Sequence, residues 1–451
     1  MTLPAMTLPG YRLHLFALVH LALMFLLARN AHGQIVYDPE AYRQLTDAAA
    51  RQTPPVGTKI TLQNWQDYRR FMTVGMQAAF SGKYRFRIGA EAEYVIEVAP
   101  TRSLTLPRRY LDDTQKYQGQ ERLVPSSAGG YALSPLPAGT AGLPFGTDPD
   151  EPDRGYKVVY NWWLAYSPRI SHFYDEISTL DRYRNVGHQT VDFSFYRLSH
   201  LSESGFPAAL PYARGYLNST RLVMVAPEQI KYNTTLQMWS ENPAQFPDFY
   251  SFLPSQRHSL RLATTATCKP MEGSDFVQDD IGFQQAHFKV AFLGLKKLLT
   301  RIQDPEKGRN PASYDITASF PAWPTPGSGR WEIRDSYVID LQPLPILGNY
   351  CYSHRVVYID KETWFNVFTE MYDADGKFWK IHWNNAAPVR DGDREVLINP
   401  ASQVGGVMLD FKDNHVSIDL FRDMTIGELV PRQYQNAEQL AFPGGLQQVL
   451  Q

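Results

Sequence analysis

The chain has 451 residues, with 44 Lys and Arg against 46 Asp and Glu, which gives a formal net charge of −2 at pH 7. This near-neutral balance argues against a nucleic-acid partner, because proteins that bind nucleic acids carry a basic face for the phosphates. A chain of this length can bury a large hydrophobic core, either as one large β domain or as two smaller domains.

The N-terminal segment, residues 1–33, is predicted to be a secretory signal peptide. Basic residues precede an apolar run at 15–27, and a small-x-small cleavage site follows at 31–33. The apolar run has 13 residues, whereas a membrane-spanning helix needs ~20. A retained membrane anchor is the alternative. We therefore expect an exported protein in which residues 34–451 form a single β-rich domain.

Two helices are expected near the start of the domain. Residues 38–51 have the pattern of a short amphipathic helix. Residues 65–81 form a clearer helix, because apolar residues recur at helical spacing after the N-cap Asn64 and Gly82 ends the run. Such an apolar stripe normally packs in the core. In this chain the helix could also plug an apolar sheet face.

The next part of the chain is irregular. Strand-like patterns at 84–88 and 93–98 are followed by a long segment, about 104–153, in which Pro, Gly, Ser, Asp and Thr dominate without a sustained period. We predict that this segment is an irregular surface insertion, long enough to act as a lid or contact arm. Residues 156–166 fit either a short helix or a buried strand.

The remainder is rich in strands joined by short turns. Residues 274–283 predict a short acidic helix, and 295–302 fit either a hairpin strand or a helix. The other strands are expected at 190–198, 214–225, 230–240, 249–253, 259–263, 288–294, 331–341, 406–411 and 415–421. The predicted fold class is mainly β (α+β), with a large antiparallel sheet forming an open or closed barrel and a few helices.

The clearest local pattern is the meander at 350–385. A loop of Ala374, Asp375 and Gly376 predicts a hairpin in which Asp373 pairs with Lys377 and Gly376 has a left-handed conformation.

This register pairs Tyr372 with Phe378 and Glu370 with Lys380. A four-residue turn at 360–363 sets Val356 beside Val367 and Tyr358 beside Phe365. Together they bring eight side chains onto one apolar face. They are Val356, Tyr358, Phe365, Val367, Met371, Trp379, Ile381 and Trp383. Such a face has to be covered by another layer of protein or by a ligand. We predict that these residues form the hydrophobic lining of a ligand site.

The sequence contains two cysteines, Cys268 and Cys351. In an oxidising exported compartment we expect them to form a disulfide that ties the middle of the chain to the meander. Two separate buried thiols are the alternative.

Known catalytic motifs are absent from the sequence. It has no G-x-S-x-G, H-E-x-x-H, P-loop, G-x-G-x-x-G or C-x-x-C pattern. The acidic run at 148–153 fits no EF-hand spacing, and the neighbouring Asp279 and Asp280 should point in different directions. His354 and His382 lack a third ligand, so they are predicted to be structural. We therefore predict no catalytic residue, no metal site and no cofactor.

Several stretches resemble a bacterial family of unknown function that is usually labelled outer-membrane lipoprotein-sorting-like. They include RDSYVIDLQPLPI (334–346), YCYSHRVVYIDKETW (350–364), YDADGKFWK (372–380) and SFLPSQRHSLRL (251–262). Further resemblance is found in APEQIKY (226–232) and at 64–88, so the resemblance covers most of residues 34–451.

The resemblance implies a periplasmic protein, with association with the outer membrane as an alternative, and a fold similar to that of the LolA/LolB carriers. Those carriers have an open antiparallel barrel with helices at its mouth and an apolar interior for acyl chains. It also implies a partner among exporters of the resistance-nodulation-division type or outer-membrane proteins, and it supports pairing of Cys268 with Cys351. The family offers no catalytic residues to carry over, and this chain is about twice as long as a LolA-type carrier.

Three functional hypotheses follow. The first is a periplasmic carrier that binds a lipid, a lipoprotein acyl chain or another hydrophobic molecule and works with an export system. The second is a non-catalytic assembly or scaffold factor at the outer membrane, whose barrel is filled by its own side chains. The third is a lipid-modifying enzyme with an unrecognised site.

Overall fold

The computed structural model describes residues 34–49, 53–81, 95–134, 139–183, 185–262, 268, 270–271, 273–302, 330–391, 393–398 and 402–450. The chain divides into two compact units, Met1–Val36 and Tyr37–Gln451, and the second unit is described below. The expected signal peptide at 1–33 and the expected strand at 84–88 lie outside the described residues. No helix in the described part of the chain combines the length and apolarity needed to cross a membrane.

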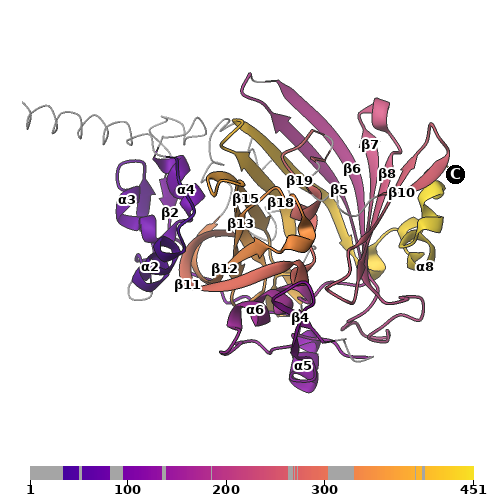
Figure 1. Cartoon of the computed structure of the whole chain (residues 1–451), viewed down its shortest axis with the longest axis horizontal. Coiled ribbons are helices and arrows are strands. Elements are labelled where there is room, and N and C mark those ends of the chain that lie inside the picture. The colour runs from indigo at the N-terminus through magenta and orange to yellow at the C-terminus, as the bar shows by residue number, and fades with distance from the viewer. Residues whose placement is uncertain are drawn as a thin grey trace, which may run out of the picture. The chain divides into compact units, whose positions relative to one another are not determined.

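One large sheet dominates the described structure (Figure 1). Its strand order is β10-β9-β8-β7-β6-β5-β19-β18-β15-β11-β12-β13-β14, and all neighbours pair antiparallel except β11 with β15. The bounds are β5 Ile170–Leu180, β6 Val186–Arg197, β7 Tyr216–Ala226, β8 Thr234–Ser240, β9 Asp248–Leu253, β10 His258–Leu262, β11 Phe288–Ile302, β12 Arg330–Pro343, β13 His354–Asp360, β14 Asn366–Tyr372, β15 Phe378–Ala386, β18 Gln403–Asp410 and β19 His415–Ile426. The predicted mainly-β, antiparallel fold class is confirmed.

The smaller elements lie outside this sheet. Three short strand pairs are β1 Lys59–Thr61 with β2 Val95–Glu97, β3 Leu123–Pro125 with β4 Tyr131–Leu133, and β16 Val389–Asp391 with β17 Arg394–Val396. The described helices are α2 Pro39–Ala49, α3 Trp65–Tyr68, α4 Val74–Phe80, α5 Arg108–Tyr117, α6 Arg154–Trp163, α7 Gln278–Ile281 and α8 Ala437–Leu440.

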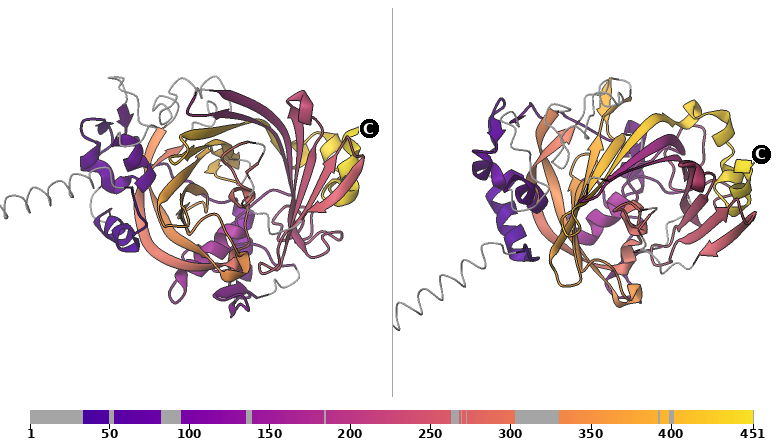
Figure 2. Two further views of the ribbon diagram at one scale, coloured as in Figure 1. Left: turned by 45° about the horizontal axis from the view of Figure 1, so that its top comes forward. Right: turned by 90° about the horizontal axis from the view of Figure 1, so that it is seen from above.

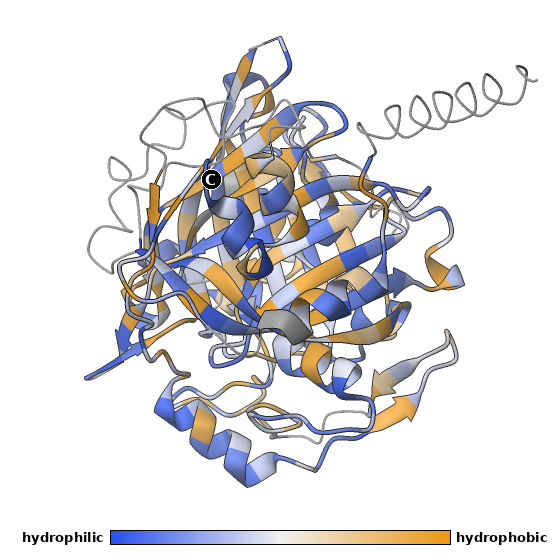
Figure 3. Ribbon diagram, turned by 90° about the vertical axis from the view of Figure 1, so that its left-hand side faces the viewer, coloured by the Kyte–Doolittle hydropathy of each residue, from blue (hydrophilic) through white to orange (hydrophobic). Residues whose placement is uncertain are grey.

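The strands β11 to β15 close into a ring. Strand β15 pairs with β14 and β18, and a single parallel bridge joins its Ala386 to Ile302 of β11. The N-terminal helices lie beside this ring, whereas α8 and the 3-10 segment Pro443–Leu450 lie at the other end of the sheet (Figure 2). Hydrophobic and hydrophilic residues alternate along many strands, as expected for sheet faces with different environments (Figure 3).

Two hydrophobic clusters pack α6 and the C-terminal segment against the large sheet. In the first, α6 packs through Val158 and Val159 with Ile339 of β12 and Val357 of β13. In the second, the C-terminal segment from Val430 to Leu446 packs against strands of the β5–β9 region. Both clusters remove many apolar side chains from water, so they contribute to stability through the hydrophobic effect.

The expected helix at 65–81 is broken into two helices. Helix α3 ends at Tyr68, a 3-10 turn follows, and Met72 is extended before α4 begins. The Thr73 hydroxyl caps α4 by accepting a hydrogen bond from the Met76 amide at 3.1 Å. The break frees the Met72 carbonyl, which accepts a hydrogen bond from the buried Lys296 ammonium at 2.5 Å. A tertiary contact therefore decides where the helix stops.

The prediction of a wholly irregular segment at 104–153 is wrong. It contains the ten-residue helix α5 and the hairpin β3–β4. Tyr110 and Thr114 give α5 a narrow buried stripe, which the surrounding Pro- and Gly-rich sequence obscured. The ambiguous segment at 156–166 is mostly the helix α6, and 295–302 continues the strand β11.

The meander forms the predicted hairpin, but its register differs. The Asp373 amide donates to the Lys377 carbonyl at 2.8 Å, and Gly376 has φ +72°. Tyr372 pairs with Phe378, as the sequence predicted. A bulge between Met371 and Tyr372 then shifts every later pair by one residue.

The adjoining pair β13–β14 is also shifted from the prediction. Val356 pairs with Glu370, where Val367 was expected, and Tyr358 pairs with Phe368, where Phe365 was expected. The shift places the carboxylate of Glu370 among apolar side chains. Its effect on the predicted ligand lining is described below.

Cys268 and Cys351 form a disulfide, the pairing expected from the sequence. It connects the segment after β10 to the start of the meander. The Cys351 amide also donates to the Cys268 sulfur at 2.8 Å.

Candidate functional site

The eight predicted lining residues do not form one wall. Seven of them are at most 5% exposed, and Trp379, which is half-buried, donates its indole N–H to Asp410 at 2.8 Å. Val356 and Ile381 both pair with Glu370 and therefore share its face, whereas the adjacent Met371 lies on the opposite face. The bulge in β14 causes this division, so the prediction of a single apolar face is wrong.

The N-terminal helices cover the face that carries Ile381. A Cβ atom added at Gly75 of α4 would lie 2.7 Å from Cδ1 of Ile381, so the helix backbone lies directly against β15. The Tyr42 side chain of α2 is 3% exposed and reaches Glu370 and Tyr372 on β14. This side of the ring is therefore filled by the chain's own helices.

Glu370 is the centre of a buried hydrogen-bond network beneath these helices. Its carboxylate accepts hydrogen bonds from the hydroxyls of Tyr42 at 2.6 Å and Tyr358 at 3.0 Å, and from the Gly75 amide at 2.5 Å. Burial raises the pKa of Glu370, and these hydrogen bonds oppose that rise. Burial also lowers the pKa of the nearby Lys296 to about 8. The network anchors the helices to the sheet.

The two histidines singled out in the sequence lie on opposite faces. His354 pairs across the strands with Tyr372, its Nδ1 lies 3.1 Å from the Asp340 carboxylate, and its ring stacks on Tyr37. His382 pairs with Thr369 and is 8% exposed, and its Nε2 has no hydrogen-bond partner within the described residues. The two imidazoles therefore do not belong to one site.

The acidic residues singled out in the sequence form ion pairs and hydrogen bonds with other side chains of the protein. Asp280 forms an ion pair with Arg355 at 3.4 Å and accepts from the Tyr352 hydroxyl at 3.2 Å. In the run at 148–153, Asp150 pairs with Lys157 at the surface. Across the described ranges, no three His, Cys, Asp or Glu side chains are grouped in a way that could hold a metal ion.

A different face of the sheet has the features of a binding surface. Phe173 of β5 stacks on Phe193 of β6 and on Phe421 of β19, with ring centroids 4.4 and 4.3 Å apart. Phe173 is buried beneath the other two rings, which are half-buried. We call these three rings the aromatic stack.

Aliphatic side chains extend the aromatic stack along neighbouring strands. Ile177, Val191 and Met224 form a small cluster, with Leu222 and Ile230 packed against it. Val191 pairs with Met224 and Phe193 pairs with Leu222, so these side chains share a face. The aromatic stack and this cluster form a partly accessible apolar surface, which we call the aromatic face.

Two carboxylates lie at the border of the aromatic face. Asp175 pairs with Phe421 and Asp419 pairs with Ile177, so the two acids are diagonal neighbours on the same face. Oδ1 of each acid is buried without a hydrogen-bond partner in the described structure. Burial raises the pKa of Asp419 to about 7, and burial together with the Asp419 charge raises the pKa of Asp175.

A glycine allows His382 to approach these acids. Gly406 of β18 pairs with Asp419, and a Cβ atom at this position would lie 2.9 Å from both Asp419 Oδ1 and His382 Nε2. The two atoms are therefore at most about 5.8 Å apart. Burial lowers the pKa of His382 to about 3, which keeps its imidazole neutral. We call Asp175, Asp419 and His382 the acceptor group.

Few features of the sequence indicate this site. The alternation at 190–198 marked Val191 and Phe193 as one face of a strand, but not which strands would pair with it. The aromatic stack and the acceptor group combine residues from the consecutive strands β5 and β6 with residues from β15 and β19, which are far from them in the sequence. Only the strand order brings them together.

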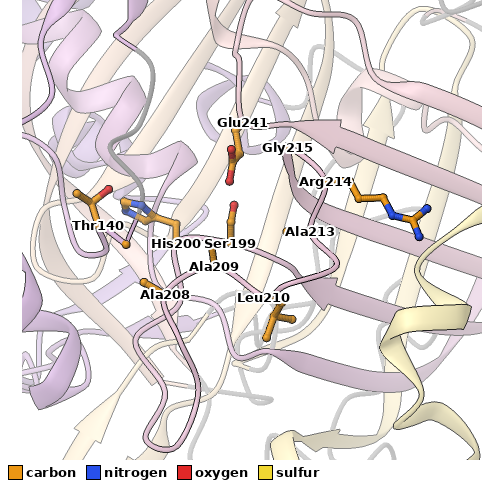
Figure 4. A pocket seen from close by; sticks show the side chains of 11 residues that line it. Thr140, Ser199, His200, Ala208, Ala209, Leu210, Ala213, Arg214, Gly215 and Glu241 are labelled. Atoms are coloured by element: carbon orange, nitrogen blue, oxygen red, sulfur yellow. The ribbon is translucent and has the colours of Figure 1, made fainter.

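A separate cavity of about 240 Å³ lies beside the loop that follows β6 (Figure 4). His200 lines it in a left-handed conformation (φ +60°), and its Nε2 donates to the Gly142 carbonyl at 2.7 Å. The side-chain oxygens of Glu241 and Ser199 point toward each other in the cavity. It is smaller than the ~300–1,000 Å³ pockets that take drug-sized ligands. Its size and lining suit a small polar molecule.

Comparisons with known proteins place the chain in a family. The family model described as "Protein of unknown function (DUF1329)" matches residues 59–440. No curated protein matches the chain. Among solved structures, the chain is similar to a domain from Vibrio parahaemolyticus described as an outer membrane lipoprotein-sorting protein, with 13% identity and a TM-score of 0.45. That likeness covers 64% of this chain and 99% of the other.

Two further solved structures are similar. A DUF1329 family protein from Desulfovibrio piger has 11% identity and a TM-score of 0.43, covering 62% of this chain and 95% of the other. A LolA superfamily protein from Nitrosomonas europaea has 13% identity and a TM-score of 0.36, covering 60% of this chain and 92% of the other. As the resemblance of its motifs predicted, the chain belongs to the DUF1329 family of proteins of unknown function.

Proposed function

We propose that the protein binds and carries a hydrophobic molecule, such as a lipid or a lipoprotein acyl chain, on the aromatic face. The observation that carries this proposal is the partly accessible surface of Phe193, Phe421 and Leu222 beside buried Ile177 and Val191. The proposed site replaces the expected lining of the meander, which is divided between two faces, one of them covered by the N-terminal helices.

The physical basis is burial of apolar surface. Each methylene group of a bound chain that leaves water contributes ~0.8 kcal/mol. Stacked aromatic rings offer a broad rigid contact that loses little side-chain entropy on binding. A chain of ten or so methylenes would then bind reversibly without any catalytic residue or cofactor, as a carrier requires.

The proposed location is the periplasm, with an envelope exporter of the resistance-nodulation-division type or an outer-membrane protein as partner. The disulfide between Cys268 and Cys351 supports an oxidising compartment. The apolar N-terminal segment that precedes the small-x-small motif supports export. The partner rests on the family resemblance alone.

A scaffold role is the second candidate, and one observation favours it. The face of the ring that carries Ile381 is filled by the N-terminal helices through Tyr42, Gly75 and Glu370. Because the N-terminal helices occupy this face, it has no room for a carried molecule. The two candidates differ in whether the aromatic face retains lipid.

Polar substitutions in the aromatic stack should abolish lipid retention. The double variant Phe193→Ser/Phe421→Ser removes the two half-buried rings and leaves the buried Phe173 in place. We expect affinity for a long-chain lipid to fall at least ~10-fold, because each large apolar contact contributes ~1.5–3 kcal/mol. Native mass spectrometry after incubation with a bacterial lipid extract measures the retained lipid.

The control variant is Leu429→Ser, since Leu429 is 78% exposed and lies away from the aromatic stack. It should retain as much lipid as the unmodified protein. If the unmodified protein retains no lipid, the carrier proposal is wrong and the scaffold role is favoured. If the double variant retains lipid normally, the carrier uses another surface.

A further inference from the structure

The acceptor group starts within the aromatic face at Asp175 and extends beyond it through Asp419 and His382, so an amphiphile lying on the face can place its polar end there. Asp175 pairs with Phe421 on one side and with Val191 on the other. Its side chain is therefore a direct neighbour of both the aromatic stack and the aliphatic cluster. A molecule lying across the aromatic face reaches these carboxylates without leaving the same side of the sheet.

Three atoms of the acceptor group have unused hydrogen-bonding capacity within the described residues. They are Oδ1 of Asp175, Oδ1 of Asp419 and Nε2 of His382. Asp419 is 6% exposed and His382 is 8% exposed. Buried polar atoms in native proteins are nearly always hydrogen-bonded, so a group of unsatisfied atoms indicates a missing partner. The group lies beside the aromatic face, the apolar surface on which we place the bound hydrophobic molecule.

The geometry permits one ligand atom to bind both His382 and Asp419. Their unsatisfied atoms are at most about 5.8 Å apart, as described above for Gly406. A single ligand donor that approaches from the face of the sheet can therefore lie within ordinary hydrogen-bond distance of both atoms, to one side of the position that a Cβ atom of residue 406 would occupy. The missing side chain at Gly406 is what allows both atoms to approach, because a Cβ atom would lie 2.9 Å from each.

The chemistry of these atoms defines the ligand class. A bound cation favours the ionised form of each acid, and an ionised carboxylate only accepts hydrogen bonds. A neutral imidazole accepts at Nε2 when its proton is on Nδ1. The guanidinium of Arg355, which acts electrostatically on His382, is already paired with Asp280 at 3.4 Å. The two acids would repel a carboxylate or phosphate. They would attract a cation, which the neighbouring aromatic rings also favour.

We infer that the carried molecule is an amphiphile with a primary amine, whose ammonium group is bound by Asp175, Asp419 and His382 while its chain lies on the aromatic face. This inference rests on the proposed carrier function. A primary ammonium has three N–H donors and one positive charge, so it can satisfy several acceptors together. A quaternary ammonium has the charge without donors, and an alcohol has one donor without the charge.

Four probes with the same chain length test this inference at pH 8. They are dodecylamine, dodecyltrimethylammonium, dodecanol and dodecanoate, titrated by isothermal calorimetry. The three charged probes are kept below their critical micelle concentrations, and dodecanol is kept below its solubility limit. We expect dodecylamine to bind at least ~10-fold more tightly than dodecanol. The trimethylated probe should fall between them, and dodecanoate should bind most weakly.

Variants assign the preference to the acceptor group. Asp419→Asn keeps the size of the side chain but removes its charge, and Gly406→Ala fills the space between Asp419 and His382. Each should bring dodecylamine affinity to within ~3-fold of dodecanol affinity in the same variant, and a circular dichroism spectrum that matches the unmodified protein shows that the variant is folded. Asp413→Asn is the matched control, because Asp413 is exposed in the turn before β19 and the preference should persist.

The outcomes separate this inference from the carrier proposal. If dodecanol or dodecanoate binds as tightly as dodecylamine, the amine inference is wrong while the carrier proposal stands. If Asp419→Asn leaves the amine preference intact, the acceptor group does not bind the head group. If none of the four probes binds, both proposals are wrong.

Discussion

Replacing Glu370 with alanine should lower the free energy of unfolding by about 3–5 kcal/mol. The substitution removes the acceptor for the Tyr42 and Tyr358 hydroxyls and for the Gly75 amide. It also leaves the Lys296 ammonium, which is 1% exposed, without the nearby carboxylate. A buried group that loses its partner costs far more than a surface ion pair. Chemical denaturation followed by tryptophan fluorescence measures the loss.

Glu228→Ala is the matched control, because Glu228 forms an exposed ion pair with Lys231 at 3.1 Å. Exposed ion pairs contribute ~0–1 kcal/mol, so this variant should unfold almost as the unmodified protein does. The double variant Lys296→Met/Glu370→Leu should recover part of the loss, because it removes both buried groups. Equal losses in the Glu370→Ala and Glu228→Ala variants would show that Glu370 does not anchor the N-terminal helices.

Replacing Asp419 with asparagine should stabilise the protein at pH 8, and the gain should shrink progressively as the pH falls toward 4. Burial raises the pKa of Asp419 to about 7 in the folded state, above its ordinary value of 3.8. The folded state therefore holds a proton that the unfolded state releases between these values, and stability falls as the pH rises through this window. Asparagine does not titrate, so the variant avoids this loss.

The expected gain at pH 8 is on the order of 3 kcal/mol, because one pKa unit corresponds to 1.36 kcal/mol. Asp419 and Asp175 interact, so the variant should also bring the pKa of Asp175 closer to its ordinary value. Denaturant unfolding curves at pH 5, 6, 7 and 8 measure the difference. Parallel stability profiles for the two proteins would contradict the prediction. A gain together with lost amine binding would mean that Asp419 is retained for binding at the expense of stability.

The local turns were predictable because their residues are sufficient to specify them. Asp373, Gly376 and Lys377 form the hairpin that the glycine position indicated, and Asp410 pairs with His415 across the last predicted turn. Alternation of apolar and polar residues likewise indicated an antiparallel β protein. These features depend on residues only a few positions apart.

The register of β14 depended on distant residues and was not predictable in this way. The sequence favoured Glu370 opposite Lys380, since opposite charges attract across strands. In the structure Glu370 pairs with Ile381, and its carboxylate binds groups of α2 and α4. Those partners are 328 and 295 positions away, so no local comparison of neighbouring residues includes them.

The candidate site was missed for a related reason. Asp175 and Asp419 come together because β5 pairs with β19, which the intervening chain does not indicate. His382 appeared to be a structural histidine, and only its position beside Gly406 shows an unsatisfied nitrogen. The missed helix α5 differs from these cases, since its buried Tyr110 and Thr114 already had helical spacing.

The docking of the N-terminal helices onto β14 has a consequence for biosynthesis. The ribosome makes α2 and α4 roughly 300 residues before it makes their partner Glu370. Such distant contacts carry a large entropic cost of loop closure and slow the folding of a nascent chain. Until β14 emerges, the apolar surface of α4 around Met76 and Phe80 stays uncovered. We expect the newly made chain to need a holding chaperone during this interval.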